Sequence, residues 1–361
     1  MATDRKIAKI VEQFETAQNS LVLQSSDFSL ETIAKMVEQD AIDASPQYQR
    51  RERWTHEAQS LLVESFLLNV PVPPVYLAED DFGTYSVIDG KQRITAIFQF
   101  MRNKFKLKGL KEFPSLEGVA FSELPRELRN ALSIRPYIRV VTLLKQTSPE
   151  LKYEVFTRLN SGGEPLLPQE IRNALFRGKL NDSIMEASVA PFLAQQLKIK
   201  TQKETAYATM QDVELVLRFL TLEESWQNFS GDMRRSMDHF MEKNGKISAV
   251  KRTTLITKFQ TALSRCESIW GDDSFKRPST NAATRDQFLS GLYDAQMIAI
   301  ANISEAKYRR IIGNMSIAKK ETKALFKDPI FDDAVRRSTN SPVRVKYRIQ
   351  KMIDTLENVG K

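Results

Sequence analysis

The chain has 361 residues, of which 42% are hydrophobic and 27% charged, a balance typical of globular proteins and unlike that of disordered chains. This length predicts two or three domains, or one domain with a large extension. With only two histidines and one cysteine in the sequence, a Cys/His zinc site and an internal disulfide are excluded, and we expect no haem.

The sequence has no apolar run near the roughly 20 residues of a membrane-spanning helix, so we expect no membrane partner. The first 18 residues spread their charges through a helical pattern and lack the apolar centre of a signal peptide. A single cysteine fits a reducing compartment. We therefore expect a cytoplasmic protein, and the sequence leaves its oligomeric state open.

Positive charge is concentrated in the last third of the chain. Residues 241–361 contain 23 Lys and Arg against 13 Asp and Glu, whereas residues 1–240 contain 30 against 32. A one-sided basic surface favours a polyanionic partner such as nucleic acid. The alternative is a solvated helical surface with no such partner.

The first 145 residues alternate between helical and strand patterns. Helical spacing of apolar residues predicts helices over residues 4–18, 30–37, 55–67, 91–103 and 122–132. Runs of β-branched and aromatic residues predict strands over 75–77, 85–88 and 137–144, the first two as a hairpin through 80–83. Phe105 and Leu107 alternate with lysines, which predicts an edge strand.

From Pro149 onward the pattern is almost entirely helical. It predicts helices over 150–159, from 168, and over 182–197, 210–222, 232–243, 250–269, 284–302, 305–324 and 341–358, with a loop at 270–284. We therefore predict an α+β fold in three parts. These are a small mixed α/β core over residues 1–147, a helical domain over 148–245, and a basic helical C-terminal region over 246–361.

The stretch Asp89–Arg93 joins a buried strand to a helix through a sharp turn. A helix that starts directly after a strand presents unpaired N–H groups and a partial positive charge at its first turn. Gly90 allows close approach to the backbone, and Lys91 and Arg93 add positive charge. These features predict a phosphate site, with Asp89 to hold Mg²⁺ or orient a water. The alternative is an ordinary glycine turn with solvated basic residues and a capping aspartate.

Two further polar clusters could belong to the same site. Arg50 and Arg53 precede Trp54, and an arginine can grip phosphate with two parallel hydrogen bonds while tryptophan stacks on a base. The run Asn160–Gly163 follows a predicted helix, where small residues can form a concave set of N–H groups that binds an anion. Each cluster also has a purely structural interpretation. The first can be a surface loop, and the second can be a helix that ends at a glycine.

The order of these motifs resembles the N-terminal domain of GmrSD-type restriction endonucleases, within the ParB and sulfiredoxin-like superfamily. The resemblance covers roughly residues 25–240 and is carried by Gln-Arg before Trp54, by Asp-Gly-x-Gln-Arg at 89–93, and by the segment Phe156–Ala174. It implies a ParB-like core whose Asp-Gly-Gln-Gln-Arg motif binds and hydrolyses a nucleoside triphosphate. It also implies a role in bacterial defence against phage DNA, often DNA with modified bases.

By position, Asp89, Gly90, Gln92 and Arg93 match the first motif, with Lys91 where the family usually has Gln. The combined interpretation assigns catalysis to Asp89, Gln92 and Arg93, and places Mg²⁺ on Asp89. It assigns phosphate binding to Gly90, Lys91, Arg93, Arg50, Arg53, Asn160, Gly162 and Gly163. Family members often carry a C-terminal HNH-type nuclease domain, but a sequence with only two histidines argues against one here.

Three functional hypotheses follow. In the first, an anti-phage or restriction-type protein couples nucleoside triphosphate binding and hydrolysis to the sensing of foreign, base-modified DNA. In the second, the chain damages DNA directly through Asp89, as a nuclease or as a glycosylase that excises a modified base. In the third, it is a non-catalytic DNA-binding adaptor that recruits a separate nuclease.

Overall fold

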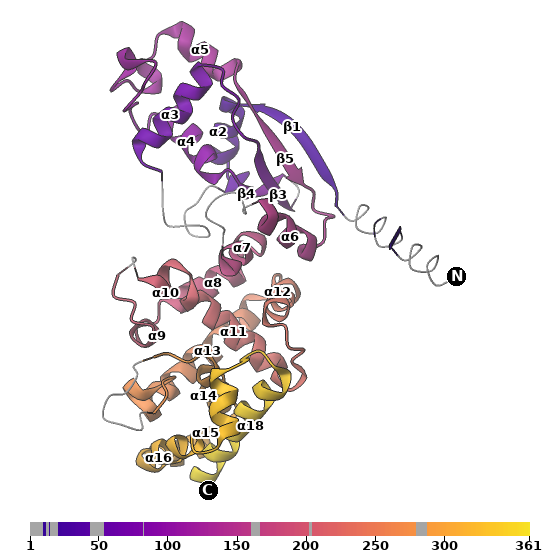
Figure 1. Ribbon diagram of the computed structural model, residues 1–361, viewed down its shortest axis with the longest axis vertical. Coiled ribbons are helices and arrows are strands. Elements are labelled where there is room, and N and C mark those ends of the chain that lie inside the picture. Colours follow the sequence, from indigo (N-terminus) through magenta and orange to yellow (C-terminus); the bar gives the residue numbers. More distant parts are fainter. Residues whose placement is uncertain are drawn as a thin grey trace. The chain divides into compact units, whose positions relative to one another are not determined.

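The structure is a computed structural model that describes residues 10–11, 14, 21–43, 54–81, 83–159, 167–201, 204–278 and 287–361. By its internal contacts the chain divides into two compact units, Met1–Leu175 and Phe176–Lys361. The N-terminal unit contains a mixed β-sheet with helices, and the C-terminal unit is helical (Figure 1). The predicted α+β fold is confirmed.

The sheet of the N-terminal unit has five strands among the described residues. They are β1 (Leu23–Ser29), β2 (Ile42–Asp43), β3 (Val75–Asp81), β4 (Thr84–Asp89) and β5 (Tyr137–Leu143), in the spatial order β1-β5-β3-β4-β2. The pairs β3/β5 and β2/β4 are parallel, and β1/β5 and β3/β4 are antiparallel. The predicted hairpin of β3 and β4 is confirmed.

The central strands of this sheet are covered on both faces. Successive strand residues point to opposite faces, so Leu77 and Val87 join one core while Ala78 and Ile88 join another. The first face is covered by α2 (Leu30–Glu38), α3 (His56–Leu67), α4 (Lys91–Met101) and α5 (Arg126–Ile134). The second face is covered by α6 (Pro149–Leu159) and α7 (Pro168–Leu175) (Figure 1).

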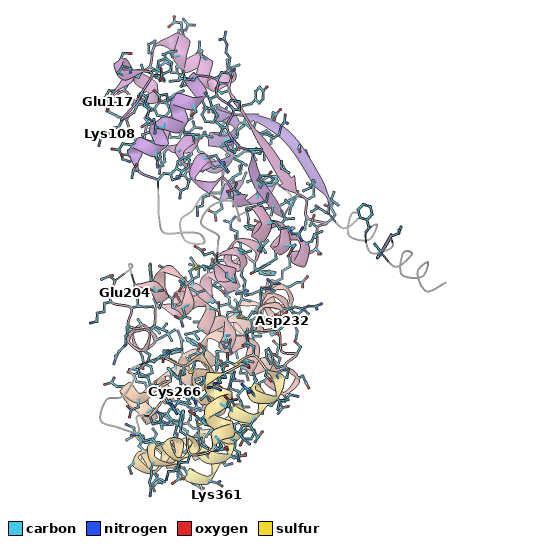
Figure 2. All side chains as sticks on the ribbon, viewed as in Figure 1. Lys108, Glu117, Glu204, Asp232, Cys266 and Lys361 are labelled. Carbon is cyan, nitrogen blue, oxygen red and sulfur yellow. The ribbon has the colours of Figure 1, made fainter. Side chains whose placement is uncertain are left out.

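The C-terminal unit is built around one apolar helix. Its described helices are α8 (Lys179–Ser188), α9 (Pro191–Gln196), α10 (Thr205–Ala208), α11 (Gln211–Ser225), α12 (Met233–Asn244), α13 (Ala249–Trp270), α14 (Ser290–Asn302), α15 (Glu305–Gly313), α16 (Met315–Leu325), α17 (Pro329–Arg336) and α18 (Pro342–Val359). Residues 291–300 of α14 are all buried, and α11, α13, α17 and α18 pack around this helix. Cys266, whose thiol pKa is raised by burial, lies in the same core (Figure 2).

None of the helices in the described ranges combines the length and the apolar composition that crossing a bilayer requires.

A charged cluster lies in the middle of this helical core. The Asp294 carboxylate of α14 accepts two hydrogen bonds of 2.7 Å from the Arg218 guanidinium of α11 and a further one from Nη2 of Arg348 on α18. The Asp294 and Arg348 side chains are fully buried, and that of Arg218 is 7% exposed. Arg348 Nη1 donates to the Ala334 carbonyl oxygen at 3.0 Å. One carboxylate therefore binds two buried guanidinium groups from separate helices.

The domain boundaries differ from the predicted ones because α6 and α7 pack on the sheet. Tyr153 and Phe156 of α6 and Ile171 of α7 share a core with Ile88 of β4, which moves the boundary from 147/148 to 175/176. No boundary falls near 245/246, because the helices on both sides of it contribute to one continuous core.

The predicted edge strand at residues 104–108 is wrong. Phe105 and Leu107 are buried, but they lie in an irregular segment whose Leu107 N–H and carbonyl pair with Val119 and Gly118. Phe105 stacks on the ring of His56, with 5.5 Å between ring centroids. The alternation of lysine with apolar residues therefore reflects a loop whose apolar side chains are buried against the helices while its lysines face outward.

Candidate functional site

The Asp89–Arg93 turn lies where β4 ends and α4 begins. Asp89 is the last residue of β4, and Gly90 is the N-cap of α4 with a φ of +93°. A Cβ on Gly90 would lie 2.9 Å from Cγ2 of Val75 and 3.1 Å from Nε and Nη2 of Arg93. Both the backbone angle and the lack of space therefore require glycine. Lys91, Gln92 and Arg93 form the first turn of α4, whose N–H groups and dipole favour an anion.

Arg93 is fixed across this turn. Its Nη2 donates to Oδ2 of Asp89 at 2.8 Å, and the arginine side chain is 14% exposed while that of Asp89 is 38% exposed. Arg93 Nε is buried and has no hydrogen-bond partner among the described residues. A buried guanidinium N–H without an acceptor is costly and uncommon. The arrangement therefore offers a donor at the helix start that a bound oxygen could satisfy.

Gln92 connects the turn to the start of α3. Its Oε1 accepts the backbone N–H of Trp54 at 3.3 Å, and the Trp54 carbonyl accepts Nε2 of Gln59 at 3.4 Å. The Trp54 side chain is 38% exposed, and the neighbouring Thr55 caps α3 through its hydroxyl. The predicted catalytic role of Gln92 stays a prediction, and the contact in the structure is one that positions Trp54. Sequence reasoning missed Gln59, for which no motif gives a signal.

The helix that follows the second motif also packs on the strand of this turn. Gln169, Arg172 and Asn173 of α7 are all buried. Gln169 Nε2 donates to Oδ1 of Asn173 at 2.8 Å, and Arg172 Nη1 donates to Oε1 of Gln169 at 2.5 Å. Since α7 packs against β4, the fold brings the C-terminal part of the second motif to the strand that carries Asp89.

Part of the predicted site lies outside the described residues. This holds for Arg50, Arg53, Asn160, Gly162 and Gly163. In the described ranges, no three or more His, Cys, Asp or Glu side chains are grouped so that they could hold a metal ion. A Mg²⁺ ion at Asp89 would therefore need most of its ligands from water and substrate, which is how this ion is commonly bound.

A second polar group lies on the α6 face of the sheet. Asp80 of β3 accepts a 2.5 Å hydrogen bond from the hydroxyl of Ser86 on β4. Burial raises the pKa of Asp80 to about 6, against the opposing effects of the Ser86 hydrogen bond and the Lys152 charge. Lys152 of α6 donates to the Glu79 carbonyl oxygen at 2.9 Å, and burial lowers the pKa of its amine.

This pKa predicts a pH dependence of stability for the N-terminal unit. The Asp80 pKa rises from 3.8 in the unfolded chain to about 6 in the fold, so between these values the folded state binds more protons. Its contribution to stability is therefore full below pH about 4 and lost as pH rises through about 6. We expect Asp80→Asn to reduce the change of the urea-denaturation midpoint with pH between pH 4 and pH 7. An unchanged pH profile in the variant would contradict this assignment.

The comparisons with known proteins agree with the motif. Residues 32–177 match the family described as GmrSD restriction endonuclease, N-terminal domain. The match is shorter than the 25–240 expected from the motifs, and it ends close to the boundary between the two units. No curated protein and no solved structure matches the chain. The predicted resemblance to the GmrSD restriction endonuclease N-terminal domain is therefore confirmed for residues 32–177.

Proposed function

We propose that the N-terminal unit binds a nucleoside triphosphate at the Asp89–Arg93 turn and hydrolyses it as part of a restriction system directed at foreign DNA. The observation that carries this proposal is Arg93. Its guanidinium is held at the N-terminus of α4 by Asp89, and its buried Nε lacks an acceptor among the described residues. A phosphate oxygen would supply that acceptor in a place where the helix dipole also favours negative charge.

Each residue of the turn has a role in this proposal. Gly90 sets the left-handed turn at the helix start and has no side chain to keep a phosphate from the backbone there. Lys91 and Arg93 neutralise phosphate charge, which stabilises the charge that develops during phosphoryl transfer. Gln92 positions Trp54 through the 3.3 Å hydrogen bond, and the exposed indole offers a surface on which the base could stack.

Asp89 would supply the carboxylate oxygen that holds Mg²⁺ or activates the attacking water. Arg93 bonds to its Oδ2, so Oδ1 can ligate a Mg²⁺ ion or accept a proton from the attacking water. Mg²⁺ suits a single carboxylate because it retains several waters and takes its other ligands from substrate phosphates. When bound, it would neutralise charge between the phosphates.

The C-terminal unit would provide DNA contacts. Its excess of basic residues favours binding to the phosphate backbone, with an affinity that falls steeply as salt rises. Recognition of a base modification and recruitment of a separate nuclease are further parts of the proposal.

Nucleotide hydrolysis by the purified chain, with and without DNA, tests the proposal. We expect Asp89→Asn to lower kcat at least about 100-fold, as loss of a catalytic carboxylate commonly does. The matched control is Asp27→Asn, which removes the same charge from an exposed Asp27–Arg139 ion pair between β1 and β5 and should hydrolyse nucleotide normally. Equal turnover in wild type and Asp89→Asn would refute the hydrolase proposal.

The same preparation separates this proposal from the other two hypotheses. Modified and unmodified phage DNA, incubated with the protein, is assayed for strand breaks and, separately, for abasic sites. Asp89-dependent products without nucleotide hydrolysis would identify a nuclease or a glycosylase. Salt-sensitive DNA binding that persists in Asp89→Asn, with no product from any substrate, would identify an adaptor.

A further inference from the structure

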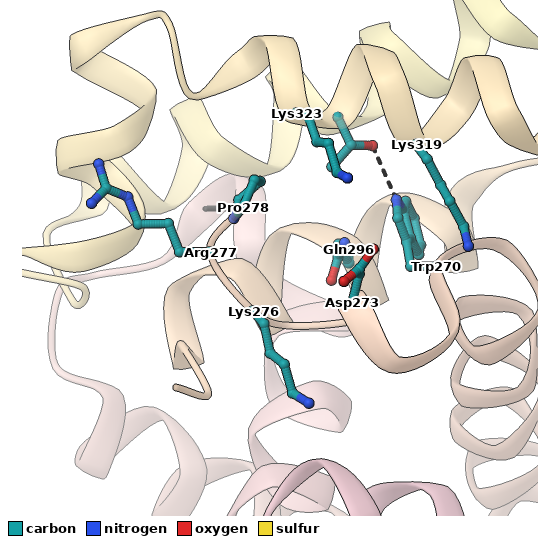
Figure 3. A pocket seen from close by; sticks show the side chains of 9 residues that line it. Trp270, Asp273, Lys276, Arg277, Pro278, Gln296, Lys319 and Lys323 are labelled. Carbon is teal, nitrogen blue, oxygen red and sulfur yellow. Dashed lines mark hydrogen bonds between the residues drawn. The ribbon is translucent and has the colours of Figure 1, made fainter. Parts of the chain in front are cut away.

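A pocket in the C-terminal unit has a buried floor and a charged rim. Its lining comes from the end of α13, the segment 273–278, α14 and α16 (Figure 3). The cavity volume is about 120 Å³. This is close to the roughly 150 Å³ of a protein cavity that holds a benzene molecule. The pocket can therefore take one flat ring but not a whole nucleotide.

The floor of the pocket consists of aromatic and uncharged polar side chains. Trp270, Gln296 and Thr322 line it and are 2%, 1% and 4% exposed. The indole Nε1 of Trp270 donates to Oγ1 of Thr322 at 3.0 Å (Figure 3). The Oε1 of Gln296 accepts the backbone N–H of Phe275 at 2.7 Å. These bonds fix the indole in place and leave the amide NH₂ of Gln296 as the donor of the floor.

The rim carries the charge. Lys319 and Lys323 project from one face of α16, and the exposed Asp273 also lines the pocket (Figure 3). Across the described part of the chain, none of these three side chains forms an ion pair. Lys276 and Arg277 add positive charge to the lining, although Arg277 is paired with Asp332 at 3.0 Å. An amide donor at the floor, with a carboxylate and lysines at the rim, forms the pattern of a site for a neutral ring that carries an anion.

We propose that this pocket binds the base of one nucleotide, with its phosphate on Lys319 and Lys323. The edge of a nucleobase offers both acceptors and donors, which complement the Gln296 amide and the Asp273 carboxylate, and its apolar ring suits the part of the Trp270 indole that lines the pocket. A phosphate alone fits less well, because the buried floor has no cation to neutralise it. The same chemistry has two sources, a free mononucleotide and a base turned out of a DNA strand.

The test compares two duplexes by fluorescence anisotropy, one fully paired and one with a single unpaired cytosine. No nucleoside triphosphate or Mg²⁺ is present. We expect the full-length protein to bind the bulged duplex at least about 10-fold more tightly, since one or two hydrogen bonds to charged groups are worth that factor. Asp273→Asn and the double variant Lys319→Gln/Lys323→Gln should bring the ratio close to one.

The matched control is Lys320→Gln/Lys327→Gln, which removes the same charge from two exposed lysines on or just after α16 that do not line the pocket. It should weaken both duplexes equally and keep their ratio. If wild type shows no preference and dCMP does not compete, or if control and pocket variants behave alike, the proposal is wrong. Competition by dCMP at equal strength against both duplexes would assign the pocket to free nucleotides.

This inference does not rest on nucleotide hydrolysis by the N-terminal unit. Asp89→Asn should retain the preference for the bulged duplex, because Asp89 belongs to the other unit. The two proposals can therefore fail separately.

Discussion

Asp294→Ala is expected to destabilise the C-terminal unit by about 3–5 kcal/mol, because breaking a buried ion pair leaves an uncompensated charge. Here the loss is compounded, since Arg218 and Arg348 would be left with like charges in the same core. Urea denaturation followed by tryptophan fluorescence measures it, because Trp226 and Trp270 are both buried in this unit.

Two further variants sharpen this measurement. Asp354→Ala removes an exposed carboxylate from α18 and should change stability by less than about 0.5 kcal/mol. Arg348→Met should cost less than Asp294→Ala, because Asp294 keeps its two 2.7 Å bonds to Arg218 and an apolar side chain replaces a guanidinium whose Nε lacks a partner among the described residues. A loss below about 1 kcal/mol for Asp294→Ala would show that the cluster is not a main source of stability.

Gly90→Ala is expected to destabilise the N-terminal unit by about 2–4 kcal/mol and to abolish nucleotide binding. An alanine would adopt an unfavourable φ of +93° and bring its Cβ to 2.9 Å from Val75, a fully buried residue. The backbone strain costs on the order of 1–3 kcal/mol, and overpacking adds a similar amount. The new methyl would also displace the Arg93 guanidinium. Thermal unfolding and nucleotide titration measure the two effects.

Gly118→Ala separates the cost of backbone strain from the cost of overpacking. Gly118 also has a left-handed backbone, with a φ of +75°, but a Cβ there would meet no atom within 4 Å. Its substitution should therefore show the backbone cost alone. Equal losses for Gly90→Ala and Gly118→Ala would show that the contact with Val75 contributes nothing.

The sequence predicted those helices and strands in which buried apolar residues recur at a regular spacing. The strands β3, β4 and β5 and helix α4 are examples. It missed β1, whose sequence LQSSDFS lacks apolar alternation because none of the residues of this strand is buried. It also missed α17, although Asp328 caps this helix and Pro329 occupies its first turn. An Asp-Pro pair before an amphipathic run is a signal that could have found it.

The candidate site was predictable only in part, for a similar reason. Asp89–Arg93 is a local motif, so its turn geometry follows from neighbouring residues. The contact of Gly90 with Val75 and the bond between Gln92 and Trp54 join residues that are distant in sequence. They arise from the packing of helices on the sheet, which no single sequence segment encodes. Helices predicted as continuous over 182–197 and 305–324 are divided at Pro191 and Asn314.

The strand order has a consequence for how the chain acquires its structure. β5 lies between β1 and β3, so Leu23 finds its partner Leu143 only 120 positions later. During synthesis the β3–β4 hairpin can pair as soon as it emerges, whereas β1 has no neighbour until β5 has been made. Such long-range pairing slows folding, since loop-closure entropy is lost before the contacts form. We therefore expect the docking of β1 to be a late event in the folding of the N-terminal unit.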